Sequence, residues 1–288
     1  MRTLPKPTDD AQALFLRCAA GYIQLKTKAL KQRLYSASAA IRAAAERYET
    51  AAQSTTLHQI PESDTVDGPG TATKSDMVDL YENKLTRVGS PGRALYDKLL
   101  SLPPRGICPL CGQGIVSTLD HHLPKSTFPA LAVAPTNLVP SCSNCNFRKL
   151  VVRPSCSEDE TLHPYFDDFT GEQWLHAVVQ ESESPTLSFS VHQPEGWTRL
   201  RSARAARHLY VFGLPKLYTT YAAEEMVNIK GRLAAEFGRA GRDGVRQFLR
   251  EEAESRETAH LNSWQTATYW ALARSDWFCA VGHTKIGD

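Results

Sequence analysis

Two Cys-x-x-Cys pairs, separated by thirty residues, place the tightest restriction on how this chain can fold. They are Cys108 with Cys111 and Cys142 with Cys145. Each pair can hold two thiolates on one side of a tight turn, and two such turns complete a tetrahedral shell of four sulfurs, which suits zinc. A closed shell leaves no position for a substrate, so the metal would instead staple a polar segment that cannot fold alone. The sequence therefore predicts a structural Zn²⁺ at these four cysteines.

Two other roles for these cysteines are less well supported. Free cysteine often packs as a small hydrophobe, but matched spacing at both ends, with Gly112 directly after the first pair, favours metal binding. Disulfides are disfavoured because the chain has seven cysteines and its first residues lack the apolar stretch of a signal peptide. The remaining cysteines are expected to be core or unreactive surface residues: Cys18, Cys156 and Cys279.

The segment between the two pairs contains side chains suited to acid–base and metal chemistry. Residues 115–120 alternate well enough for a short strand, which would end at His121 and His122. A histidine that is neutral near pH 7 is a natural general base for a water molecule. The neighbouring carboxylate of Asp120 is a donor that a hard cation such as Mg²⁺ prefers.

The residues after the last cysteine extend this pattern. A helix is expected to begin near Phe147, so the turn of the second cysteine pair would bring Asn146 towards the end of the strand. Its amide oxygen can serve as a second cation ligand. Arg148 and Lys149 follow immediately and are suited to phosphate oxygens.

Together these motifs resemble those of HNH endonucleases with the ββα-metal fold, in the subgroup with four zinc-binding cysteines. The matching runs are L-D-H-H-L-P-K-S at residues 119–126 and P-T-N-L-V-P-S-C-S-N-C-N-F-R-K at residues 135–149. The three signature positions would be His121, Asn137 and Asn146. The resemblance covers about forty residues and is specific as a whole.

The resemblance implies a role for each residue. Asp120 and Asn146 would bind one catalytic divalent cation, Mg²⁺ or Mn²⁺, and His121 would be the general base. Asn137 would pin the loop between the two strands by hydrogen bonds to the backbone. The substrate-binding residues would be His122, Lys125, Arg148 and Lys149.

One position departs from the family pattern. The residue after the general base is usually apolar, and here it is His122. Strict strand alternation would also place Asp120 and His122 on one face and His121 on the other. His122 thus stays open as an alternative base, although the family pattern favours His121.

The fold class expected is α+β, mainly helical, with a ββα-metal HNH core between an N-terminal helical arm and a C-terminal helical bundle. The regions would be residues 1–102, with a mobile linker at about 54–75, then 103–155, then 156–288 with a hairpin. In the first helical region an apolar stripe is predicted at Leu14, Cys18, Tyr22, Leu25 and Ala29. Helices are predicted over 8–53 (one or two), 77–87, 91–102, 215–237, 242–254 and 260–273, and the hairpin over 174–179 and 186–192.

Composition and charge bound the function. No run approaches the roughly twenty apolar residues that a membrane helix needs, so a cytoplasmic protein without a membrane partner is expected. Residues 93–153 contain seven basic and two acidic residues, whereas residues 154–288 contain fourteen basic and nineteen acidic ones. Positive charge therefore lies where phosphate would be bound.

The wider layout resembles the HNH subunit of Septu-type anti-phage systems. The shared features are an M-R-x-L-P-K-P start, the L-D-H-x-L-P-K-S core and an H-P-Y-F-D run that begins at His163. The resemblance implies an ABC-type ATPase partner. Such a partner would also explain why the chain has no phosphate-binding G-x-x-x-x-G-K-[ST] motif of its own. The function expected is metal-dependent hydrolysis of DNA or RNA in anti-phage defence. The alternative is a non-catalytic, zinc-stabilised module that binds nucleic acid or protein.

Overall fold

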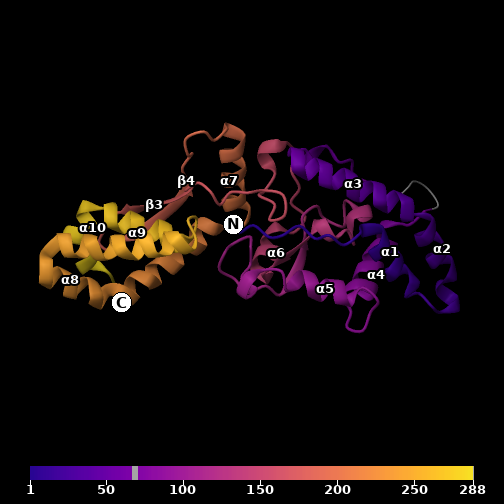
Figure 1. The fold of residues 1–288 in the computed structure, drawn as a ribbon, viewed down its shortest axis with the longest axis horizontal. Helices are drawn as coiled ribbons and strands as arrows, with labels where there is room; N and C mark the ends of the chain where they lie inside the picture. The colour runs from indigo at the N-terminus through magenta and orange to yellow at the C-terminus, as the bar shows by residue number, and fades with distance from the viewer. Residues whose placement is uncertain (67–70, 288) are drawn as a thin grey trace. The chain divides into compact units, whose positions relative to one another are not determined.

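The computed structural model describes residues 1–66 and 71–287, which form two compact units, Arg2–Asp167 and Asp168–Asp288 (Figure 1). The fold is mainly helical α+β, with two small two-stranded sheets, one in each unit. Residues 1–102 and 103–155, separate regions by sequence, pack within the first unit, and the division falls after Asp167. No helix in the described residues combines the length and apolar character needed to cross a membrane.

The first unit begins with three helices where one or two were expected. They are α1 (Ala11–Ala20), α2 (Lys28–Ser36) and α3 (Ser38–Ser54). The side chain of Asp10 caps α1 by accepting a hydrogen bond from the backbone of Ala13, at 2.6 Å. The helix ends at Gly21, where a Cβ atom would lie 2.7 Å from Pro91.

This early helix end corrects the predicted apolar stripe. Leu14, Cys18 and Tyr22 are buried in the core, but Leu25 and Ala29 are exposed. The stripe assumed one unbroken helical phase, and the chain leaves α-helical geometry after Ala20, so the later positions turn to solvent.

The segment predicted as a linker is tied to the unit on both sides of residues 67–70, which lie outside the described residues. The backbone N–H of Ser63 donates to Thr127 O at 3.2 Å, and Lys74 N–H donates to Asp64 O at 2.9 Å. Thr73 then starts α4 (Lys74–Leu80) with a capping box that uses Asp76. A π-helical turn, Tyr81–Thr86, continues α4, and α5 (Arg93–Leu100) follows.

A short ββα unit occupies the region of the cysteines and histidines. Strand β1 (Thr118–His121) pairs antiparallel with β2 (Leu138–Ser141), with His121 opposite Leu138. Helix α6 (Ser143–Lys149) begins directly afterwards, capped by Cys142. Leu119 and Leu138 belong to the same apolar core as α1 and α5, which fixes the two short strands on the helical layer.

The second unit contains the predicted hairpin, β3 (Leu175–Gln180) and β4 (Thr186–Val191). Its helices are α7 (Arg199–Val211), α8 (Leu214–Ala259), α9 (Trp264–Arg274) and α10 (Asp276–Ala280). The break predicted between the helices over 215–237 and 242–254 is present, since the helical backbone of α8 is interrupted at Ala240 and Gly241. Gly241 adopts φ 60° and ψ −150°, which a residue with a side chain rarely adopts.

Candidate metal centre and adjoining histidine site

The four paired cysteines converge on one point. Each offers a sulfur, all four sulfurs lie within 4.8 Å of one another, and all four residues are buried. The sulfurs of Cys111 and Cys142 are 3.9 Å apart, close to the edge of about 3.8 Å expected for a tetrahedron with Zn–S bonds of 2.3 Å. Both the donor chemistry and the spacing therefore fit a structural zinc ion, held by Cys108, Cys111, Cys142 and Cys145.

The turns around the sulfurs have the geometry of metal-binding knuckles. Gly112 closes the first turn by donating to Cys108 O at 2.8 Å, and its φ of +67° favours glycine. The N–H of Gly114 donates to the sulfur of Cys111 at 3.2 Å. A Cβ atom on Gly114 would lie 2.7 Å from the sulfur of Cys142, so only glycine lets the two halves of the cluster approach.

Crowding of the sulfurs favours the thiolate form at two positions. A hydrogen bond from Cys108 is the main cause that lowers the pKa of Cys142, to about 7, and it also lowers the pKa of Cys111. The same contacts between sulfurs raise the pKa of Cys108 and of Cys145, so two of the four sulfurs favour the thiolate that zinc binds and the other two would lose a proton when the metal binds.

Asp120 and His121 lie at the end of β1, beside α6. Both are buried, and so is Lys149 on the last turn of α6. The Lys149 ammonium lies 3.2 Å from Asp120 Oδ2 and donates to His121 O at 2.6 Å. Burial raises the pKa of Asp120, while the Lys149 charge opposes that shift. Lys149, expected to contact substrate phosphate, is thus placed against the carboxylate of its own chain.

The imidazole of His121 is held in one tautomer. Its Nε2 lies 2.9 Å from Ala132 O, and a carbonyl only accepts, so Nε2 carries the proton and Nδ1 carries the lone pair. Burial lowers the pKa of His121 to about 3, so the ring is neutral at physiological pH. The ring of Tyr81 packs against it, with centroids 4.5 Å apart. A neutral, oriented imidazole can accept a proton through Nδ1.

Asn137 joins the two ends of the loop between β1 and β2. It is fully buried, and its Oδ1 accepts from Leu123 N–H at 2.7 Å. Its Nδ2 donates to Leu123 O at 3.0 Å and to Leu131 O at 3.2 Å. All three bonds are to backbone, so this side chain positions the loop that holds His121.

Replacing Asn137 with Ala should therefore destabilise the first unit. The change leaves buried backbone groups of Leu123 and Leu131 without their partner, at a cost of about 2–3 kcal/mol. Urea unfolding followed by circular dichroism measures the loss. Asn144→Ala, on the exposed side of α6, is the matched control and should change stability little. Equal stability of the two variants would contradict a role for Asn137 in holding the loop between β1 and β2.

His122 lies in a different environment from His121. It is buried, and its ring is 4.2 Å from that of His163. The Nδ1 atom of His163 accepts from Tyr165 N–H at 3.1 Å, and its Nε2 lies 2.8 Å from the hydroxyl of Tyr48. His122 thus belongs to a buried aromatic cluster.

The other predicted substrate-binding residues lie nearer to solvent. Lys125 is half-buried, with its ammonium over the ring of Tyr81 and 3.9 Å from a Glu82 carboxylate oxygen. Arg148 is exposed on α6. Asn146, predicted as a cation ligand, is half-buried on α6. It lies three residues before Lys149 and therefore on the same face of the helix as the Lys149 side chain, which contacts Asp120.

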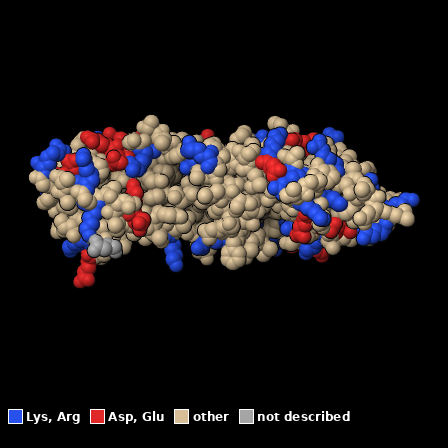
Figure 2. Space-filling model, turned by 90° about the horizontal axis from the view of Figure 1, so that it is seen from below, with Lys and Arg blue, Asp and Glu red and all other residues tan. Residues whose placement is uncertain are grey.

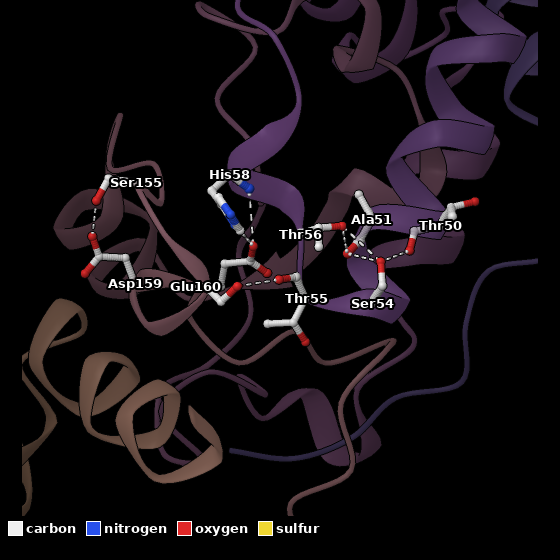
Figure 3. A network of polar contacts seen from close by, with 10 residues as sticks. Thr50, Ala51, Ser54, Thr55, Thr56, His58, Ser155, Asp159 and Glu160 are labelled. Carbon is white, nitrogen blue, oxygen red and sulfur yellow. Dashed lines mark hydrogen bonds and ion pairs between the residues drawn. The ribbon is translucent and has the colours of Figure 1, made fainter. Parts of the chain in front are cut away.

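Several site neighbours were not identified from the sequence. Tyr48 and Tyr81 come from the N-terminal helices, more than thirty residues from the histidines they contact. The buried Glu160 accepts at 2.9 Å from His58 Nδ1 and also bonds His58 N–H, as Figure 3 shows. This pair ties the segment after α6 to the end of α3. The H-P-Y-F-D run that begins at His163 was the one local signal for this part of the site in the sequence.

The chain is 30% identical over 223 residues to protein ea31 of Escherichia phage lambda, a match that covers 73% of this chain and 75% of that protein. It belongs to the same family as that phage protein. No family model matches the chain, and no solved structure matches it.

Proposed function

We propose that this chain is a metal-dependent HNH endonuclease that hydrolyses phosphodiester bonds in DNA or RNA. The order β1–β2–α6, with the four cysteines at its turns, supports this assignment. Asp120 and His121 end the first strand, and Asn146 lies on the helix, as in the ββα-metal arrangement. The name of protein ea31 states no activity, so the proposal rests on the residues of this chain.

The environment of His121 is the observation that carries the proposal. His121 is buried, directly follows the buried carboxylate of Asp120 in β1, and has a backbone carbonyl that selects one tautomer of its ring. Here the Nε2 proton is held by Ala132 O, which leaves Nδ1 as acceptor for a proton from water.

The remaining residues would bind and orient. The carboxylate of Asp120 and the amide oxygen of Asn146 are hard donors that would hold Mg²⁺ or Mn²⁺. Such an ion supplies charge stabilisation to a phosphoryl transition state when bound. Lys125 and Arg148 would contact backbone phosphate, which positions the nucleic acid without reading sequence.

Charge distribution argues for a targeted rather than a coating nuclease. Figure 2 shows Lys and Arg side chains intermixed with Asp and Glu over the face drawn, rather than gathered in one broad field. Binding by counterion release alone would be weak on such a surface. We therefore propose that a partner, an ABC-type ATPase as the Septu-type resemblance implies, delivers or gates this cytoplasmic nuclease in anti-phage defence.

One observation favours a second candidate, the non-catalytic binding module. The Lys149 ammonium already neutralises Asp120, and a carboxylate paired in this way needs no divalent ion. In a binding module the pair would serve only to hold α6 on β1. The two candidates differ in whether loss of His121 abolishes a reaction.

Purified wild type and His121→Ala, incubated with plasmid DNA and with total cellular RNA, test the proposal. Each is assayed with Mg²⁺, Mn²⁺ or a chelator, with and without cell lysate. We expect metal-dependent cutting by the wild type and about a hundred- to ten-thousand-fold less by the variant, the usual contribution of a general base. His192→Ala, which changes an exposed histidine of the second unit, is the control. Equal cutting by wild type and His121→Ala would exclude His121 as base, and no cutting under any condition would favour the binding module.

A further inference from the structure

A row of exposed apolar side chains begins directly beside the proposed site. Phe147 is 71% exposed, Leu150 is 59% exposed and Val151 is 65% exposed. We call these three residues the apolar ridge. Water-facing apolar side chains so close together are more typical of a binding surface than of an ordinary protein exterior.

The ridge is held in place rather than free to collapse onto the core. Lys149 lies between Phe147 and Leu150 in the sequence, but its side chain is buried and bonded to Asp120 and His121. Leu150 N–H donates to Asn146 O at 3.0 Å, and Val152 N–H donates to Lys149 O at 2.8 Å. Leu150 adopts φ +43°, a conformation that is costly for a residue with a branched side chain. The anchored turn therefore keeps the ridge presented to solvent.

Charge identifies the kind of molecule that would cover the ridge. Arg148 lies between Phe147 and Leu150 in sequence and is exposed, and among the described residues it has no ion-pair partner. An exposed cation interleaved with an aromatic side chain matches a nucleic-acid strand, where bases stack and phosphates pair. A protein seated here would also cover Asn146, which precedes Phe147 in the proposed site.

We propose that the apolar ridge contacts the faces of unstacked bases, so that the site acts on nucleic acid whose bases are already exposed or are wedged apart. This inference rests on the proposed nuclease function and adds the substrate class to it. Phe147 would stack on a base and Leu150 would fill the space beside it, while Arg148 takes the adjoining phosphate. Exposed bases occur in single strands and in kinked or bulged duplexes, and the test separates these sources.

The test measures binding by the full-length chain carrying His121→Ala, which prevents cleavage. Fluorescence anisotropy is recorded for one labelled sequence as a single strand, as a perfect duplex and as a duplex with a central bulge. A 2-aminopurine base in each reports unstacking. Adding Phe147→Ala should weaken binding to the single strand or the bulged duplex about tenfold and abolish the 2-aminopurine change. Phe147→Trp should restore both.

Two controls separate stacking from other effects. Ile23→Ala removes an equally exposed apolar side chain, 86% exposed, far from the ridge in sequence, and should leave binding unchanged. Arg148→Ala should weaken binding to all three forms alike. It should also lower, by about one unit, the slope of the logarithm of the binding constant against the logarithm of the salt concentration. The same binding measurements are repeated in the wild-type background with Ca²⁺. Agreement between the two backgrounds shows that the His121 change has not altered the fold.

Three results would overturn the inference. If Phe147→Ala binds like the parent while the wild type still cleaves, the ridge does not touch bases but the nuclease proposal stands. If the wild type neither binds the three forms nor cleaves, the proposed function fails and this inference fails with it. If Phe147→Ala leaves binding intact but lowers the mass of the protein in sedimentation, the ridge instead packs against another protein chain.

Discussion

Replacing Cys142 with Ser should abolish zinc binding and unfold the ββα region of the first unit. The sulfurs of the cluster hold residues 108–145 together, a segment whose two strands are only four residues each. Structural zinc binding in isolated fingers amounts to about 10–16 kcal/mol, and most of it is folding free energy. The first unit also has a helical core, so we expect the ββα region to unfold while α1 and α3 retain helix.

Metal content and thermal unfolding measure this effect. The wild type should carry one zinc per chain, and a strong chelator or acid should release it with loss of cooperative melting, because protons compete for the thiolates. Cys142→Ser should behave like the chelated protein. Cys156→Ser is the matched control, since Cys156 lies outside the cluster. A zinc-free wild type with the same melting curve would contradict the metal centre.

Replacing Lys149 with Met should destabilise the chain by about 3–5 kcal/mol, the usual cost of leaving one member of a buried ion pair alone. Asp120 is 4% exposed and its carboxylate lies 3.2 Å from the Lys149 ammonium. Once the ammonium is removed, little water can reach the carboxylate to solvate it. Burial already raises the pKa of Asp120, and removing the cation should raise it further. A raised carboxyl pKa favours the folded state at low pH, so the deficit should shrink as the pH falls.

Two further variants test the cause of that loss. Lys149→Met combined with Asp120→Asn removes both charges and should recover most of the stability, because no buried charge remains. Lys125→Met, which removes a half-buried ammonium near Glu82, should cost far less. Urea unfolding compares the four proteins. Failure of the double variant to recover would mean that the Lys149 side chain contributes mainly by packing.

Divalent ions should distinguish the two candidate functions in the same variant. With Lys149 removed, a divalent ion can take the place of the ammonium at a pH where Asp120 is ionised, so Mg²⁺ or Mn²⁺ should raise the melting temperature of Lys149→Met more than that of the wild type. Asp120→Asn should abolish this response. An unchanged response in Lys149→Met would show that the position beside Asp120 does not accept a divalent ion.

Local sequence patterns predicted a large part of the architecture. The spacing of Cys108, Cys111, Cys142 and Cys145 specified a cluster before any fold was known, because a tight turn places its own two sulfurs together. Alternation located the two hairpin strands within one residue at each end and placed β1 within three residues of its start. The sequence left open whether the first helical stretch is one helix or two. The chain forms three helices, and at Gly21, where α1 ends, a Cβ atom would lie 2.7 Å from Pro91, seventy residues away.

The sequence by itself determined which chemistry this chain can offer: four thiolates in two pairs, a carboxylate beside a histidine, and two asparagines at matching positions. Only the tertiary structure decided how those groups are used. Lys149 was read as a phosphate contact because Arg148 and Lys149 look alike in sequence, yet α6 turns one outward and the other onto Asp120. Which face of a helix is buried depends on what packs against it, and that is a property of the folded chain.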